Sequence, residues 1–139
     1  MISSSMLTIV LVTHAPLGQA LYLGAEHVLQ SKPQVLVADI QADELIQPWV
    51  DKLTARIQTL AQPYVLILCD LYGSTPYHIT SAVQRQLSLK GQAVHVVSGV
   101  NLSMLVKALT SSAADIDQYI AGVLHSAQRA IVHQAPTLS

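Results

Sequence analysis

The chain alternates between short apolar runs and longer segments in which apolar residues return every three or four positions. The short runs are rich in Val, Leu and Ile and cover residues Leu7–Thr13, Gln34–Ile40, Tyr64–Asp70 and Ala93–Ser98. The first and third runs are almost continuously apolar, which is typical of strands that are covered on both faces of a parallel sheet. The pattern therefore predicts four parallel strands.

Segments with helical periodicity separate and follow these strands. Their apolar stripes run through residues 17–29, 45–60, 79–87, 102–109 and 116–127. Each stripe repeats with the period of an amphipathic helix. Alternating strands and helices predict an α/β fold. We expect one doubly wound domain over residues 1–139, with a mainly parallel sheet of strand order 2-1-3-4 and helices on both faces.

The two ends of the chain lack a periodic pattern. We expect residues 1–5 and 135–139 to be frayed. Residues Met1–Met6 have neither a basic start nor an apolar run followed by a cleavage site, so they do not resemble a signal peptide. No apolar stretch approaches the ~20 residues that cross a bilayer, and we expect a cytoplasmic protein. Met6 is an alternative start that the sequence does not decide.

Composition narrows the function classes. Half of the 139 residues are apolar, 11% are charged and the net charge is -1. Without a basic run, the chain lacks the electrostatic footprint of a nucleic-acid or membrane-surface binder. A surface so poor in charge favours coverage by a second copy of the chain. The single cysteine, Cys69, falls in an apolar run, and we expect a buried, inert thiol.

Polar residues of the right kind for phosphate chemistry follow the first and third strands. In open α/β sheets, ligands bind outside the carboxyl ends of the strands, where the strand order reverses. With order 2-1-3-4, the first and third strands are neighbours, which places His14 beside Asp70. A carboxylate that accepts a hydrogen bond from one ring nitrogen leaves the other nitrogen free and nucleophilic.

The segment after Asp70 is suited to hold an anion. Thr75 is a favourable N-cap and Pro76 a favourable first helical residue, so we expect a helix to begin here. Free N–H groups at a helix N-terminus bind anions. Ser74 and Thr75 add hydroxyl groups, and Gly73 lets the backbone approach closely. These residues predict a histidine that accepts a phosphoryl group, with an orienting acid and a phosphate cradle.

Each of these features also has a structural interpretation. A lone histidine at a strand end is often a satisfied structural residue, Asp70 alone could cap a loop, and a Gly-Ser-Thr-Pro segment is often only a turn. Their co-location favours the site. His78, in the first turn of the predicted helix, and Asn101, after the fourth strand, are possible further contacts. The remaining histidines show no metal-ligand spacing, so we expect neither a metal nor a cofactor.

Three segments resemble the IIA component of bacterial phosphoenolpyruvate-dependent sugar phosphotransferase systems (PTS), in the mannose, fructose and sorbose family. They are IVLVTHAPLGQAL, DLYGSTPYHITSA and SGVNLSMLVKAL. The resemblance implies that His14 is phosphorylated on its tele nitrogen, Nε2, and that Asp70 is its hydrogen-bonding acid. It places Thr75 where the mannose protein has a serine beside the phosphate. It also implies a homodimer in which a C-terminal edge strand, here Ala130–Gln134, is exchanged between subunits.

The resemblance implies partners as well. Its members take phosphate from the carrier protein HPr and pass it to a IIB component, which makes this chain a phosphotransferase. The chain stops before the linker and IIB domain of the mannose transporter protein, so we expect a separate IIB. Contact with the membrane would then come only through a transporter complex. Ser74 in place of a glycine, His78 in place of a frequent asparagine and Ser103 in place of a proline depart from the family pattern.

Two other functions remain open. In a regulatory IIA protein, the phosphorylation state would control a partner rather than sugar transport. A non-catalytic nucleotide-binding or response-regulator-like module is the other alternative. A receiver domain needs an acidic pair after the first strand, where this chain has His14, and no glycine-rich phosphate-loop motif is present. Neither the sugar nor the acceptor can be read from the sequence.

Overall fold

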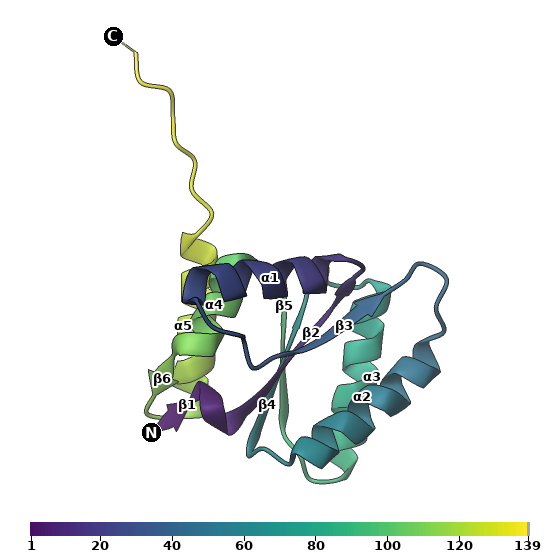
Figure 1. Cartoon of the computed structure of the whole chain (residues 1–139). Coiled ribbons are helices and arrows are strands. Elements are labelled where there is room, and N and C mark those ends of the chain that lie inside the picture. Colours follow the sequence, from purple (N-terminus) through teal and green to yellow (C-terminus); the bar gives the residue numbers. More distant parts are fainter. Residues whose placement is uncertain (139) are drawn as a thin grey trace.

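The computed structural model describes residues 1–138, and its centre is a four-stranded parallel sheet (Figure 1). The strands lie in the order β3 (Leu36–Ile40), β2 (Leu7–His14), β4 (Tyr64–Cys69) and β5 (Val94–Ser98). Numbered along the chain, this is the predicted order 2-1-3-4. The strand that ends in His14 is therefore internal, between β3 and β4.

Helices cover both faces of this sheet, as predicted. Those of the described residues are α1 (Leu17–Leu29), α2 (Ile46–Leu60), α3 (Thr75–Leu89), α4 (Leu102–Thr110) and α5 (Ile116–Arg129). Helices α1, α4 and α5 pack on one face, and α2 and α3 on the other (Figure 1). The arrangement is the doubly wound α/β fold.

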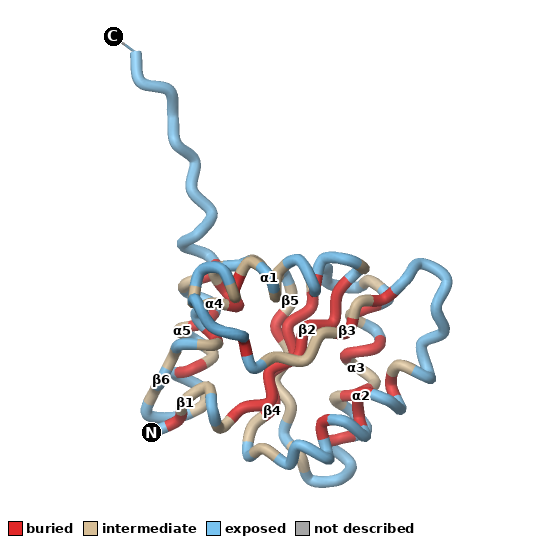
Figure 2. The backbone as a smooth tube through the Cα atoms, viewed as in Figure 1, coloured by how far each residue is buried: buried red, intermediate tan, exposed pale blue. Residues whose placement is uncertain are grey.

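The internal strands are largely apolar because both of their faces are buried. In β2, Ile9 and Leu11 belong to the core beneath α1, α4 and α5, whereas Val10 and Val12 belong to the core beneath α2 and α3. Figure 2 shows most of β2 and β4 in red, the colour of buried residues. The same sequence pattern therefore explains both the strand and its place at the centre of the sheet.

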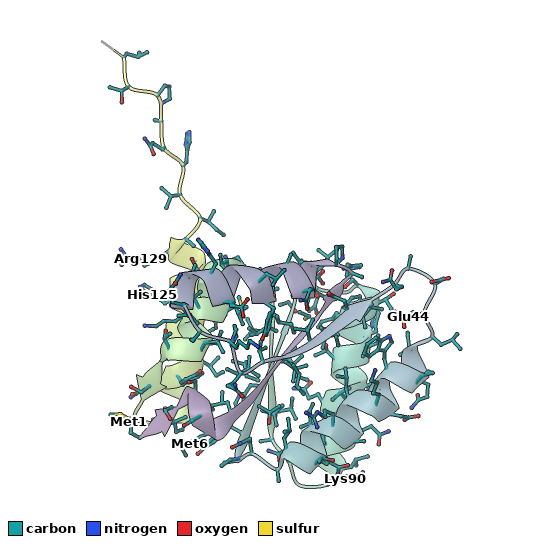
Figure 3. All side chains as sticks on the ribbon, in the orientation of Figure 1. Met1, Met6, Glu44, Lys90, His125 and Arg129 are labelled. Atoms are coloured by element: carbon teal, nitrogen blue, oxygen red, sulfur yellow. The ribbon has the colours of Figure 1, made fainter. Side chains whose placement is uncertain are left out.

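The prediction that residues 1–5 fray is wrong. Strand β1 (Ile2–Ser3) pairs antiparallel with β6 (Ser112–Ala113), and a 3-10 helix, η1 (Ser4–Met6), leads into β2. Figure 3 labels Met1 and Met6 at the two ends of this segment. The physical reason is Ile2, which is only 6% exposed and completes the apolar cluster around α4 and α5.

The chain leaves the body of the protein after α5. Residues 131–138 form neither helix nor strand and are exposed, and Figure 1 shows them pointing away from the sheet. The expected fraying of residues 135–138 stays a prediction, and Ser139 lies outside the described residues. The segment Ala130–Gln134 forms no strand within its own chain, so its exchange between subunits stays a prediction. Among residues 1–138, no helix is long and apolar enough to cross a bilayer.

Candidate functional site

His14 is the last residue of β2, and its ring contacts Asp70, the residue that follows β4. The pairing of β2 with β4 brings these strand ends together at Val12 and Cys69. His14 Nδ1 lies 2.8 Å from Asp70 Oδ2, and the His14 backbone N–H donates to the same oxygen over 2.9 Å. One carboxylate oxygen therefore fixes both the main chain and the ring of the histidine.

This contact leaves the other ring nitrogen available. A carboxylate can only accept, so it favours the tautomer in which Nδ1 carries the proton and Nε2 carries the lone pair. The His14 side chain is 51% exposed and that of Asp70 only 10%. The acid is thus held within the protein, while about half of the His14 side chain is open to solvent.

Helix α3 begins beside this pair, and its N-cap lies one residue earlier than predicted. The N-cap is Ser74, with extended backbone, while Thr75 is the first helical residue and Pro76 lies in the first turn. The Ser74 hydroxyl donates to the Leu71 carbonyl over 2.6 Å, and the Ser74 N–H donates to the same carbonyl over 3.2 Å. Ser74 closes the turn after Asp70, which commits its hydroxyl hydrogen to the loop.

Thr75 and its neighbours supply the anion-binding potential. Helix geometry gives the first N–H groups no acceptor within the helix, and the proline at position 76 has no N–H at all. The backbone N–H groups of Thr75 and Tyr77 remain, together with the exposed Thr75 hydroxyl. Gly73 has φ +83°, a conformation that favours glycine. Nothing lies within 4 Å of where a side chain would begin, so it is the backbone conformation and not a lack of space that requires glycine here.

The two further predicted contacts differ in their surroundings. His78 is exposed on α3, with its ring edge-on to Tyr77 at 5.8 Å. Asn101 is the N-cap of α4: its side-chain oxygen accepts from the Met104 N–H over 2.9 Å, and its Nδ2 donates to the Ala127 carbonyl over 3.1 Å. Both ends of the Asn101 amide are used to join α4 to α5, so its geometry does not support a phosphate contact.

Cys69 is buried directly before Asp70, as predicted. Its thiol lies 3.2 Å from the Ser98 hydroxyl. Burial raises the pKa of the thiol, which keeps it protonated. Among residues 1–138, no three His, Cys, Asp or Glu side chains gather as a metal site.

One residue that contacts the site was not among the predicted site residues. Asp39, near the end of β3, accepts hydrogen bonds from the residue before His14 and from the first turn of α1. The signal was present, because β3 neighbours β2 and Asp39 stands close to its carboxyl end. The role of Asp39 was missed because an acid near a strand end is also typical of the start of a loop.

Comparison with known proteins identifies the family of this chain. A family model described as the PTS system fructose IIA component matches residues 8–124, which include His14, Asp70 and the start of α3. The chain belongs to this family. Its members are phosphotransfer proteins. The match confirms the family that the three sequence segments predicted.

Individual relatives agree with this assignment. The sorbose-specific EIIA component of Lacticaseibacillus casei is 28% identical over 117 residues, covering 84% of this chain and 82% of the relative. The EIIA structure from Streptococcus agalactiae has a TM-score of 0.78 at 24% identity, covering 91% of this chain and 96% of its own. The mannose/sorbose-specific IIA subunit from Enterococcus faecalis has a TM-score of 0.78 at 21% identity, covering 95% and 98%. These solved IIA proteins share the fold of this IIA chain.

Proposed function

We propose that this IIA protein accepts a phosphoryl group on Nε2 of His14 from the phosphohistidine of HPr and passes it to a separate IIB protein. The observation that supports this most directly is the contact between His14 Nδ1 and Asp70, which turns an exposed histidine into an oriented nucleophile. In the transfer, the Nε2 lone pair forms a bond to phosphorus while the donor N–P bond breaks. The electron pair of that bond returns to the donor nitrogen.

Asp70 has two tasks in this step. It holds the proton on Nδ1, so that Nε2 is the attacking atom, and it stabilises the positive charge that the His14 ring gains when the N–P bond forms. A positioned acid–base partner of this kind contributes about 10²–10⁴-fold in rate. Transfer onward to IIB reverses the step: the Nε2–P bond breaks and the lone pair returns to His14.

The start of α3 holds the phosphoryl oxygens. The N–H groups of Thr75 and Tyr77 and the Thr75 hydroxyl are donors, and the helix dipole favours negative charge at this end. Gly73 and Ser74 shape the turn that presents them. Because all of these are fixed donors, the cradle needs no metal to bind the transferred group.

The surface around His14 supports a protein as phosphoryl donor. His14 is half exposed, and large apolar side chains that follow His14 or Asp70 in the chain are exposed as well: Leu71 is 61% exposed, Tyr72 74% and Leu17 38%. Exposed apolar side chains of this size beside a reactive group are typical of a protein-binding surface. HPr would dock on them and bring its phosphohistidine to Nε2.

We further propose that the protein is a cytoplasmic homodimer. The segment Ala130–Gln134 carries Ile131 and Val132, which are 80% and 76% exposed. Addition of this segment to the sheet edge of a second subunit would bury both side chains and pair the edge.

The phosphoryl transfer is tested by labelling. Incubation of the protein with phosphoenolpyruvate, enzyme I and HPr should add one acid-labile, base-stable phosphoryl group. His14→Ala should abolish it, whereas His125→Ala, an exposed histidine on α5 (Figure 3), should be labelled like the wild type. Labelling of the His14→Ala protein at the wild-type level would remove His14 from the proposed role.

A further inference from the structure

Asp39 binds the chain on both sides of His14. Its Oδ1 accepts from the Thr13 hydroxyl over 2.6 Å and from the Gly18 N–H over 2.8 Å, and its Oδ2 accepts from the Gln19 N–H over 2.9 Å. Thr13 directly precedes the histidine, and Gly18 and Gln19 form the first turn of α1. One carboxylate on β3 therefore joins the strand that carries His14 to the helix that follows it.

The surroundings of this carboxylate leave little room for movement. Thr13 is fully buried. A side chain at Gly18 would begin 2.6 Å from Asp39 Oδ1, 2.6 Å from Thr13 Oγ1 and 2.9 Å from Val37 Cγ1, closer than real contacts allow. Glycine at position 18 thus lets the backbone of α1 approach the carboxylate directly.

Asp39 also replaces a missing helix cap. The N-cap position of α1 is Pro16, whose side chain makes no cap hydrogen bond. The Asp39 carboxylate satisfies two N–H groups of the first turn instead and places negative charge at the helix N-terminus, where it is favourable. The cap comes from a neighbouring strand rather than from the helix's own sequence.

The segment between these anchors is held as well. The Ala15 N–H donates to the Ile40 carbonyl over 3.0 Å, and the His14 N–H donates to Asp70 over 2.9 Å. The segment around His14 is thus held between an acid on β3 and the acid that follows β4. Loss of the β3 anchor would free Thr13 and α1, and the Cα of His14 would move relative to Asp70.

We propose that Asp39 is a positioning residue for His14: by fixing Thr13 and the start of α1, it keeps the imidazole on Asp70 with Nε2 outward. The role assigned to Asp39 rests on the function proposed for His14, whereas the observed contacts of Asp39 do not depend on that function. In Asp39→Asn, the amide keeps one acceptor and places an NH₂ group against N–H or O–H donors, so one of the three contacts becomes repulsive.

The experiment compares Asp39→Asn, Thr13→Val and Thr13→Ser with the wild type. In ¹⁵N NMR spectra of the unphosphorylated protein, Asp39→Asn and Thr13→Val should shift the His14 ring from one tautomer toward a mixture. The rate of phosphoryl transfer from HPr at saturation should fall about 10- to 100-fold, the scale of a small misplacement of reacting groups. Thr13→Ser keeps the hydroxyl and should retain the wild-type spectrum and rate.

Two results would overturn the proposal. A lower melting temperature with an unchanged His14 tautomer and transfer rate would make Asp39 a helix cap only. Wild-type spectra in Thr13→Val would show that the Thr13 contact does not transmit to the ring, and this variant keeps the test available if Asp39→Asn fails to fold. The ring spectra need no phosphoryl donor, so failure of HPr to label the wild type would count against the proposed function alone.

Discussion

Asp70 Oδ2 accepts two hydrogen bonds from the same residue, one from the His14 ring and one from the His14 backbone. A single oxygen thus controls both which nitrogen of the ring is free and where the ring stands. We infer that the charge of this carboxylate matters more than its shape, because a neutral amide of the same shape could still fill its place in the loop.

Asp70→Asn tests this directly. The variant should fold, and its rate of phosphoryl transfer to His14 should fall about 10²–10⁴-fold, because the amide has no charge to stabilise the phosphorylated ring. Single-turnover labelling with phosphorylated HPr measures the rate, and thermal melting measures stability on the same sample. Asp115→Asn, at the N-cap of α5, is the matched control and should be labelled normally. If Asp70 only closes the turn, stability falls by about 1 kcal/mol while the rate stays that of the wild type.

The docking surface is tested by Tyr72→Ser. The variant should raise the KM for HPr about 10-fold and leave the rate at saturation unchanged, since Tyr72 is 74% exposed and its ring contacts that of Tyr77, tilted with centroids 4.6 Å apart, rather than the reacting atoms. Leu89→Ser removes an equally exposed apolar side chain (84%) at the other end of α3. Equal KM values for the two variants would mean that HPr binds elsewhere.

The proposed dimer is tested at its C-terminal segment. Removal of residues 130–139 should convert a dimer into a monomer at micromolar concentration, because it removes the exposed Ile131 and Val132 that would pair across subunits. Sedimentation velocity on both proteins gives the answer. Ile131→Ser with Val132→Ser in the chain of residues 1–139 should weaken the dimer as well. An untruncated chain that sediments only as a monomer contradicts the exchange.

Tyr119 should make stability fall in alkaline solution. Burial raises its pKa to about 12, and its hydroxyl donates to the Ala108 carbonyl. In the unfolded state the pKa of a tyrosine is about 10, so the folded state binds this proton more tightly. The stabilisation is therefore complete below pH 10. It is lost between about pH 10 and 12, where the free energy of unfolding falls by about 1.4 kcal/mol per pH unit.

Tyr119→Phe should therefore be less stable than the wild type by about 1 kcal/mol at pH 8, where the hydrogen bond is lost, and should gain on it above pH 10. Urea unfolding at pH 8 and pH 11 measures both differences. Tyr72→Phe, on an exposed ring, serves as the control. A difference between Tyr119→Phe and wild type that stays constant from pH 8 to 11 would show that Tyr119 does not titrate in this range.

The parts of the fold that depend on burial on two faces were predictable from the sequence. The continuous apolar runs of β2 and β4 could only be internal strands, and their adjacency brought His14 to Asp70. The contact between His14 and Asp70 followed from the same reasoning, because the predicted strand order makes the strands that precede these two residues neighbours. The family segments around Asp70 then narrowed the chemistry to phosphoryl transfer.

The features that were missed depend on single contacts that carry no periodic pattern. Ile2 anchors a two-residue strand, too short for any alternation to be visible. The cap of α3 shifted from Thr75 to Ser74 because both residues are good caps and the Leu71 carbonyl engages the Ser74 hydroxyl. Asp39 caps a helix from which it is separated by sequence, and only the sheet brings the two together.

The pairing of β1 with β6 also sets where the two ends of the chain emerge. It holds the start of α5 near the amino ends of the strands. Helix α5 therefore runs back toward the carboxyl ends of the strands, where His14 lies and where the Asn101 side chain donates to the Ala127 carbonyl. The N-terminus lies at the opposite edge, separated from His14 by the eight residues of β2, roughly 26 Å. A protein fused directly after α5, at Arg129, would therefore start at the end of the sheet that carries His14. With a short flexible linker, a IIB acceptor tethered there would face His14 at an effective concentration of about millimolar, whereas the same acceptor fused before Met1 would have to reach around the sheet.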